Sequence, residues 1–460
     1  MEIFLLRALQ LILSLSILVL IHEFGHFIFS RMFGVRVEKF YMFFNPLFSI
    51  FRAKKIGKKW KFSWFSSKAP ESFTAEPDKT EFGLGWVPLG GYCAIAGMID
   101  ETLKVEQMAE PEKPYEFRSK SAGQRLLIMV GGVLFNFLLA LILYSGILKV
   151  WGEEYLPLAN APMGMDYSSA AHSAGFMDGD RLLSADGVVF DRLSEATLRS
   201  VIEAKSVNVL RDGKEVNIQI PSDFMQKIMK AEETFVAFRY PTVIKDVMPG
   251  TPAKKSSLTA GDSLVSINGT TLVTFSEFSQ TLATHKNTEI DLGIYRAGSQ
   301  MTVKIVPDEN GKIGFYPKHF SEIFETKKVE YSLFAAIPAG IKKGVGKLTG
   351  YAGDMKYVFT KEGAKNIGGF GVIGSLFPPV WNWQIFWETT AFLSIILAFM
   401  NILPIPALDG GHIFFLLVEV ITRRKPGIKF MEYAQMTGMF LLFALLIFAN
   451  GNDLYRWLFK

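Results

Sequence analysis

The sequence predicts a polytopic α-helical membrane protein with four transmembrane helices and two β-rich domains inserted between the second and third helices. Apolar residues make up 49% of the 460 residues and charged residues only 20%, a composition tilted away from soluble proteins. Four apolar stretches are each long enough to cross a hydrocarbon core of about 30 Å, which takes about 20 helical residues. An internal repeat between the second and third stretches predicts the β-rich domains.

The four apolar stretches are residues 5–29, 126–148, 391–408 and 433–450. The first lacks the small-residue cleavage site of a secretory signal, so we interpret it as a retained span. It carries His22, Glu23 and His26 near its end. An ionisable side chain inside a span costs about 2.5–3.5 kcal/mol on insertion scales, so this group needs a compensating partner such as a metal ion.

Basic residues near the span ends predict the orientation of the chain. Eleven Lys and Arg residues lie near the span ends in the loops after the first and third spans, whereas four lie on the opposite side. This excess places residues 30–125 and 409–432 in the cytoplasm. Both termini and residues 149–390 are then expected outside.

The outer segment contains an internal repeat. Residues 171–187 align with residues 253–269 at a constant offset of 82. In each copy a Gly-Asp pair precedes apolar residues near alternating spacing and then Asp-Gly or Asn-Gly, which is typical of a turn, a strand and a hairpin. The repeat therefore predicts two copies of one small β-rich domain.

These features divide the chain into nine segments. We expect a first transmembrane helix at 1–30, a cytoplasmic loop at 31–125, a second transmembrane helix at 126–148, β-rich domains at 149–236 and 237–325, a linker with an interfacial helix at 326–390, a third transmembrane helix at 391–409, a cytoplasmic segment at 410–432, and a fourth transmembrane helix with its tail at 433–460.

Charge and cysteine content restrict the partners. The net charge of +5 comes from 49 basic and 44 acidic residues, a near balance without the basic field that nucleic acid requires. We therefore expect no nucleic acid partner. The single cysteine, Cys93, can form neither an internal disulfide nor a thiolate cluster. A metal ion must then be held by nitrogen and oxygen ligands.

Residues 22–26 form an H-E-x-x-H motif. On a helix its two histidines lie four residues apart on one face and can bind one zinc ion, with Glu23 in the position of the general base. A catalytic zinc ion lowers the pKa of bound water to about 7 and takes a third protein ligand. In the alternative interpretation the histidines are interfacial residues at a helix end.

The candidates for a third ligand are few. Three of the six histidines, His172, His285 and His319, lie in the outer segment, which leaves His412 and acidic residues. Asp409 stands at the inner end of the third span, and the predicted topology puts it at the depth of His22 and His26. Two prolines before it would interrupt the helix. Alternatively, Asp409 and Gly410 form an interfacial turn, and spacing alone leaves both interpretations open.

The motif in the first span, together with N-x-x-P-x-P-x-L-D-G at residues 401–410, resembles the site-2 protease family of intramembrane zinc metalloproteases. The resemblance covers almost the whole chain. It implies one zinc ion per chain held by His22, His26 and Asp409, with Glu23 as the catalytic residue and Asn401 holding substrate. It also implies a location in the bacterial cytoplasmic (inner) membrane, with the active site toward the cytoplasm and the β-rich domains in the periplasm.

The β-rich domains resemble the PDZ domains of bacterial envelope proteases. The resemblance is clear in the second copy, which has Pro-Gly-Thr-Pro-Ala at residues 249–253, and looser in the first. PDZ domains capture extended peptides by adding a strand to the edge of a sheet. Extended peptides are therefore expected partners of these domains, in addition to the lipid bilayer and transmembrane protein substrates.

Two further segments resemble parts of the same family. Residues 82–92 resemble its membrane-associated β-hairpin, in which Gly90 and Gly91 would contact substrate; a Gly-rich loop on the bilayer surface is the plain alternative. Asn136 belongs to a second-helix motif and is a further candidate substrate contact, although Gly132 stands where many members have proline. The simplest role of this motif is helix packing, with Asn136 bonding to a neighbouring helix.

The resemblance implies regulated intramembrane proteolysis of single-span membrane proteins, of the anti-sigma factor or remnant signal peptide type, after a first extracytoplasmic cut. Two alternatives exist. A non-catalytic scaffold would use the β-rich domains alone, and a membrane-anchored zinc protease would hold its metal outside the bilayer. The presence of all four site residues argues against the scaffold; they are His22, Glu23, His26 and Asp409. Their position within the spans argues against the membrane-anchored protease.

Overall fold

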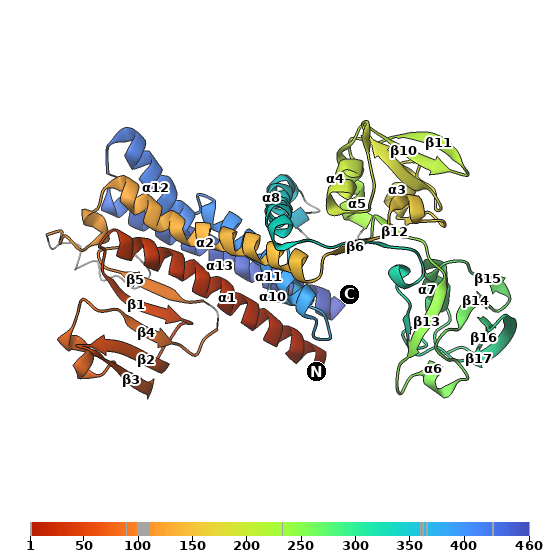
Figure 1. Cartoon of the computed structure of the whole chain (residues 1–460), viewed down its shortest axis with the longest axis horizontal. Coiled ribbons are helices and arrows are strands. Elements are labelled where there is room, and N and C mark those ends of the chain that lie inside the picture. Colours follow the sequence, from red (N-terminus) through yellow and green to blue (C-terminus); the bar gives the residue numbers. More distant parts are fainter. Residues whose placement is uncertain are drawn as a thin grey trace. The chain divides into compact units, whose positions relative to one another are not determined.

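The computed structural model describes residues 2–88, 90–98, 111–231, 233–358, 360, 363–364, 367–425 and 427–459. The chain forms two units. One unit combines Met1–Gly152 with Glu330–Lys460, and the other is Glu153–Val329. The first contains the apolar helices and one β-sheet, and the second is β-rich (Figure 1).

Four helices of the first unit are long and apolar enough to cross a membrane, as judged from length and composition in the described residues. They are α1 (Glu2–Met32), α2 (Ala122–Val150), α11 (Trp383–Ile402) and α13 (Ile428–Phe459). The third predicted span continued to residue 408, but α11 ends at Ile402. Pro404 and Pro406 lack the N–H groups that would continue the helix, so the chain leaves the helical path before them.

Helix α2 is the centre of this bundle, because it packs against both α1 and α11 (Figure 1). The crossing of α1 and α2 is close: a Cβ atom on Gly25 would collide with the backbone carbonyl of Gly131. Small residues at such a crossing let two apolar helices approach in a membrane. Further helices of this unit are α8 (Leu333–Val358), α10 (Phe370–Ser375) and α12 (Asp409–Thr422), of which α8 and α12 also pack on α2.

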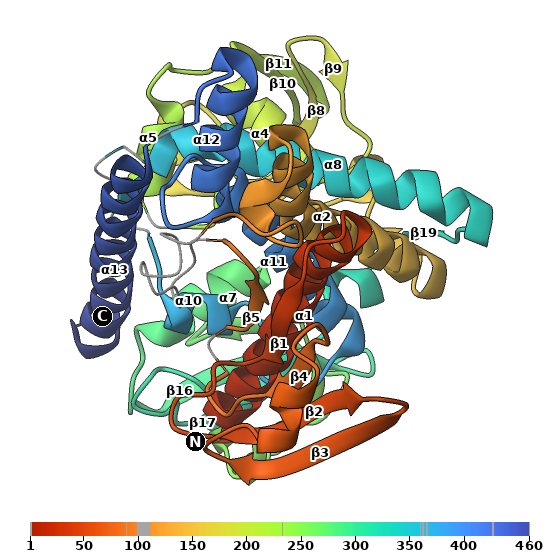
Figure 2. The same ribbon diagram turned by 90° about the vertical axis from the view of Figure 1, so that its left-hand side faces the viewer.

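The first unit also contains a five-stranded sheet. Its strands are β1 (Val37–Met42), β2 (Ser49–Ile56), β3 (Lys59–Ser66), β4 (Glu81–Leu84) and β5 (Tyr92–Ile95), in the order β3-β2-β4-β1-β5. Strands β1 and β5 contact α1 (Figure 2). The hairpin predicted at residues 82–92 does not form, because β4 and β5 both pair with β1 instead of with each other. The long connection between them lets the chain cross β1, which a two-residue turn would not allow.

The sheet exposes its apolar face and buries its charged face. Trp60, Phe62 and Trp64 of β3 are 48%, 59% and 64% exposed. On the opposite face Arg52 forms an ion pair of 3.2 Å with Glu81, and both side chains are buried. This arrangement is the reverse of the usual burial of apolar residues in a water-soluble sheet.

The second unit begins with a module of β-strands and short helices. Its elements are β6 (Glu153–Tyr155), β7 (Met165–Tyr167), α3 (Ser169–Ser173), β8 (Arg181–Ala185), β9 (Val188–Val189), α4 (Glu195–Glu203), β10 (Ser206–Arg211), β11 (Lys214–Gln219), α5 (Phe224–Ala231) and β12 (Val236–Phe238). The strands form a sheet of order β11-β10-β8-β9 and a separate β12-β7 pair. Phe176, Phe224 and Phe235 pack together in its core.

A second module of similar construction follows. Its elements are β13 (Thr242–Val247), α6 (Pro252–Lys255), β14 (Ser263–Ile267), β15 (Thr270–Thr271), α7 (Phe275–Ala283), β16 (Ile290–Arg296), β17 (Ser299–Ile305), β18 (Phe315–Pro317) and β19 (Lys327–Val329). The main sheet has the order β17-β16-β14-β13-β18, and β15 pairs with β14. Strand β19 pairs with β6, so the two ends of the unit lie together.

The repeated Gly-Asp pair has the same structural role in both modules. Asp180 is 1% exposed and accepts a hydrogen bond of 2.8 Å from Nε of Arg211. Asp262 is fully buried and accepts one of 2.6 Å from Nε of Arg296. Each carboxylate also accepts a hydrogen bond from the backbone N–H three residues before it. The hydrogen bonds from Arg296 hold the pKa of Asp262 below its ordinary value.

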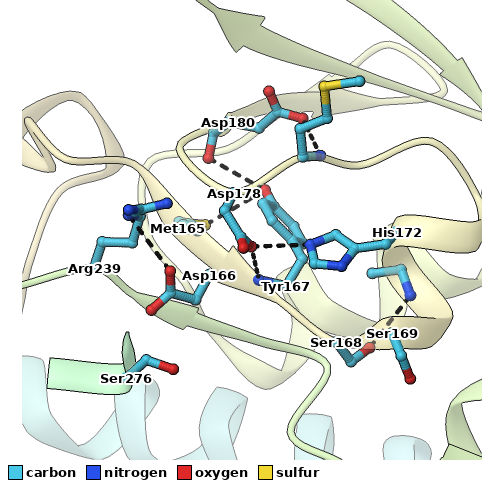
Figure 3. A network of polar contacts seen from close by, with 12 residues as sticks. Met165, Asp166, Tyr167, Ser168, Ser169, His172, Asp178, Asp180, Arg239 and Ser276 are labelled. Atoms are coloured by element: carbon cyan, nitrogen blue, oxygen red, sulfur yellow. Dashed lines mark hydrogen bonds and ion pairs between the residues drawn. The ribbon is translucent and has the colours of Figure 1, made fainter. Parts of the chain in front are cut away.

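A polar network joins the two modules. Arg239 lies 3.4 Å from Asp166 of β7 (Figure 3) and donates a hydrogen bond of 3.0 Å to Glu277 of α7. Asp178 accepts hydrogen bonds from the backbone N–H of Tyr167 and from the ring of His172. The network therefore ties the chain between the modules to elements of both.

Candidate metal centre

Two ring nitrogens and one carboxylate oxygen meet between α1 and α12. Nε2 of His22 lies 2.9 Å from Oδ2 of Asp409, and Nε2 of His26 lies 3.3 Å from the same atom. The two Nε2 atoms are 3.3 Å apart. The histidines share one face of α1 because they are four residues apart, and both are buried. The structure thus brings together the three predicted ligands.

The backbone between α11 and α12 places Asp409 at the first position of α12. Ala407 has a φ of +66°, a conformation that residues with a side chain rarely adopt. A Cβ atom on Gly410 would collide with the carbonyl of Leu403, and one on Gly411 would lie 2.7 Å from Cα of Pro406. The two glycines let the chain fold back on itself, and the fold directs Asp409 toward α1.

The donor set fits a zinc ion. Oδ2 of Asp409 is buried, and its two close neighbours among the described ionisable side chains are Nε2 of His22 and Nε2 of His26. Nδ1 of His26 donates a hydrogen bond of 2.9 Å to the backbone carbonyl of Ile128, which leaves the lone pair of Nε2 directed at the centre. Two nitrogens and one carboxylate oxygen leave a fourth tetrahedral position open, as a catalytic zinc site requires.

Glu23 lies beside this cluster. It is half-buried on α1, and its carboxylate accepts a hydrogen bond from the backbone N–H of Cys93. Cys93 is in β5, the edge strand of the sheet, so the sheet fixes the side chain next to the histidines. A carboxylate at this position can accept a proton from water at the metal.

The predicted substrate contacts occupy three different environments. Asn401 is half-buried in the last turn of α11, and its side chain forms no hydrogen bond with the described residues. Gly91 packs between β1 and α1, where a Cβ atom would lie 2.6 Å from the carbonyl of Tyr41, and Gly90 packs against the ring of Phe44. Asn136, the fourth predicted substrate contact, is fully buried, and its side-chain nitrogen lies 3.3 Å from Nδ1 of His22.

Sequence reasoning missed two groups that shape the site and the role of a third. The carbonyl of Ile128 and the N–H of Cys93 are backbone groups and have no sequence signal. Gly132 faces both rings: a Cβ atom there would lie 2.5 Å from Nε2 of His26 and 2.7 Å from Cε1 of His22. The sequence placed Gly132 in the second-helix motif, but the role expected for that motif was helix packing and not space for the rings.

A pair of imidazole nitrogens and a carboxylate oxygen, with a glutamate beside them, are the side chains that zinc-dependent proteases use. The chain belongs to peptidase family M50, the site-2 protease family, because the model of that family matches residues 10–445. It is therefore a zinc metalloprotease of the site-2 type. The family, the enzyme class and the metal predicted from the sequence are confirmed.

Several relatives match along nearly their whole length. The chain is 26% identical to the regulator of sigma-E protease RseP of Escherichia coli strain K12, in an alignment that covers 97% of each chain. It is 26% identical to the putative zinc metalloprotease NMA0084 of Neisseria meningitidis over 97% of this chain and 98% of that one. A putative zinc metalloprotease of Vibrio cholerae is 25% identical over 97% of each chain.

Proposed function

We propose that this protein is an endopeptidase that cuts single-span membrane proteins within their transmembrane segments. In this proposal His22, His26 and Asp409 hold the zinc ion and Glu23 is the general base. The observation that carries it is the meeting of three of these side chains, two from α1 and one from the start of α12, because α1 is apolar enough to cross a membrane and α12 directly follows α11, which is as well. Hydrolysis of the peptide bond, which consumes a water molecule, would then take place within the membrane, where the substrate helix lies.

Zinc bound at the three ligands would lower the pKa of water and polarise the peptide carbonyl. Glu23 accepts the proton that the attacking water loses and returns it to the amine that leaves. The hydrogen bond from Cys93 holds the Glu23 carboxylate in place for both transfers. The burial of His22 and His26 excludes bulk water from the metal side of the centre.

The free edge of β5 is proposed to bind the substrate. A transmembrane helix hides its peptide bonds in its own hydrogen bonds, so it must be unwound before it is cut. Strand β5 pairs on one side with β1 and ends the sheet on the other, where Cys93 reaches Glu23. An unwound segment that pairs with this edge would be extended beside the catalytic residues.

The sheet is proposed to lie against the membrane at the depth of the metal. Its exposed aromatic face supports this placement. The ring of Phe27 on α1, one residue after His26, contacts Phe40 and Phe82 of the sheet at centroid distances of 5.4 Å and 5.9 Å. The aromatic face therefore begins at the apolar surface of α1.

The two β-rich modules are proposed to be PDZ-like domains outside the membrane, inserted between the second and third of four spans. The excess of basic residues in the other loops supports this orientation. The Escherichia coli relative is called a regulator of sigma-E protease. We accordingly propose an anti-sigma factor or a remnant signal peptide as substrate, admitted after a first extracytoplasmic cut.

The test is cleavage of a single-span model substrate that lacks its outer domain. Purified wild-type protein, Glu23→Gln and the matched control Glu309→Gln, on an exposed loop of the second module, would be compared in detergent. We expect wild type and the control to cut within the span, as mapped by mass spectrometry, and Glu23→Gln to bind zinc without cutting. Equal cleavage by Glu23→Gln would refute the role of Glu23, and a cut outside the span would refute intramembrane proteolysis.

A further inference from the structure

Asn136 is a fully buried polar residue in an apolar helix, next to a proposed zinc ligand. Its side-chain nitrogen lies 3.3 Å from Nδ1 of His22. Its side-chain oxygen is buried and accepts no hydrogen bond from the described residues. A buried amide oxygen without a partner is costly, so this position needs an explanation.

The orientation of the Asn136 amide decides which nitrogen of His22 can bind a metal. If the amide N–H donates to Nδ1, that atom carries the lone pair and Nε2 carries the hydrogen, which is then directed at the metal centre. A ligand needs the opposite tautomer, with its lone pair on Nε2 and its hydrogen on Nδ1. The oxygen and nitrogen of an amide have nearly the same shape, and rotating the amide by 180° exchanges them.

That rotation satisfies two groups at once. The unpaired oxygen of Asn136 then faces Nδ1 of His22 and accepts its hydrogen, and Nε2 of His22 presents a lone pair toward Asp409. We infer that Asn136 is a positioning residue for the metal centre, which fixes the ring and the tautomer of His22 by accepting a hydrogen bond from Nδ1. This inference rests on the proposed ligation of zinc by His22.

The neighbouring histidine shows the same arrangement with a different acceptor. Nδ1 of His26 donates to the backbone carbonyl of Ile128. Residues 128, 132 and 136 are four apart along α2 and therefore lie on one face, with Gly132 leaving room for the rings. Helix α2 thus offers one acceptor to each histidine, although it contributes no ligand itself.

The test is the zinc affinity of the full-length protein in detergent, measured by competition with a chelator. Asn136→Leu has no acceptor, and we expect zinc affinity to fall about 10–100-fold, the usual effect of losing such a partner. Asn136→Asp has a carboxylate that accepts the same hydrogen bond, and we expect it to retain the affinity of wild type within about threefold. The matched control is Ser394→Ala, which removes a hydrogen bond to the backbone carbonyl of Asn136 but leaves its side chain; its affinity should not change.

Each outcome separates this inference from the proposed function. Loss of affinity in Asn136→Asp, with the variant folded by circular dichroism, would overturn the inference, because a donor would then be what the site requires. Unchanged affinity in Asn136→Leu would overturn it as well. If Asn136→Leu does not fold, Asn136→Asp decides alone. Wild-type affinity in His22→Ala would instead overturn the ligand set itself.

Discussion

At the scale of single residues, the metal centre depends on its glycines as much as on its ligands. Gly132 leaves space for two imidazole rings, and Gly410 and Gly411 let the chain turn so that Asp409 faces α1. The two histidines were predicted because helical geometry fixes residues four apart on one face. Asp409 needed a family resemblance, because depth in a membrane does not determine the direction in which a side chain points.

Substitution of Gly132 tests this account of the space around the rings. In Gly132→Ala the new methyl group would meet Nε2 of His26 and Cε1 of His22, so at least one ring must move away from Asp409. We expect zinc affinity to fall about tenfold or more and proteolysis to fall with it. Gly146→Ala on the same helix is the control, because a Cβ atom there meets nothing within 4 Å. Equal zinc affinity in the two variants would contradict the packing described.

The raised pKa of Asp166 predicts that the folding stability of the second unit depends on pH. Burial raises its pKa to about 6, against the opposing effect of Arg239, and Asp178 and Glu277 raise it further. A carboxyl group whose pKa is higher in the folded protein binds its proton more tightly there, so stability is lost as pH rises from about 4 to 6. The loss is at most about 3 kcal/mol for a shift of this size.

The measurement is chemical denaturation of wild type and Asp166→Asn between pH 4 and pH 7. Asparagine remains neutral, so we expect the variant to gain stability relative to wild type as pH rises. His172, near Asp178, is present in both proteins and so does not enter the difference. A difference that does not change with pH, or changes in the opposite direction, would refute the assignment to Asp166.

At the scale of elements, α12 carries Asp409 at its first residue and an ion pair near its other end. Arg125 of α2 donates a hydrogen bond of 2.5 Å to Glu419 of α12, and both side chains are buried. This pair fixes α12 along α2, which also provides Gly132 behind the histidines. Because Glu419 and Asp409 both belong to α12, the ion pair also helps to fix the position of Asp409.

Breaking this pair should harm both stability and metal binding. Glu419→Leu leaves the charge of Arg125 buried without its partner, at a cost of about 3–5 kcal/mol. We expect a lower unfolding temperature and weaker zinc binding. The double variant Arg125→Met with Glu419→Leu removes both charges and should recover most of each loss, because buried pairs can be replaced by apolar residues of similar volume. No recovery in the double variant would indicate a role other than mutual neutralisation.

The sequence was informative about elements where local physics decides them, and less so elsewhere. The long apolar stretches form helices, as predicted. Helix α11 ends before Pro404 and Pro406, because proline has no backbone N–H to continue the helical hydrogen bonds. The alternating residues of β3 indicate a strand but not which face is exposed. In water the aromatic face would be covered, and here it is exposed. The pairing of β4 and β5 with β1 was missed, because long-range pairing has no local signal.

At the scale of the whole molecule, the second unit is an insertion with adjoining ends. Tyr155 of β6 pairs with Lys327 of β19, so the chain enters and leaves the second unit through neighbouring strands about 4.8 Å apart. A few residues can therefore replace the unit. The ligands of the metal centre all belong to the first unit.

Removal of the second unit tests whether the first unit alone holds the zinc ion and cuts the substrate. We expect a chain in which a short Gly-Ser linker joins Gly152 to Glu330 to keep its zinc and to cut a single-span substrate. It should also cut substrates that retain a folded outer domain, which the intact protein should reject if the modules filter access. The measurement is the ratio of the two cleavage rates. Loss of zinc on removal would show that the centre depends on the second unit.

Two histidines of α1 and one aspartate of α12 are proposed to hold the metal ion. The most direct measurement is the zinc X-ray absorption spectrum of the purified protein, compared with that of Asp409→Ala. We expect a four-coordinate zinc with two imidazole nitrogens and oxygen ligands at about 2.0–2.2 Å, one zinc per chain, and a changed spectrum or lost zinc in the variant. A spectrum with three imidazoles, or one that is the same in Asp409→Ala, would contradict the account.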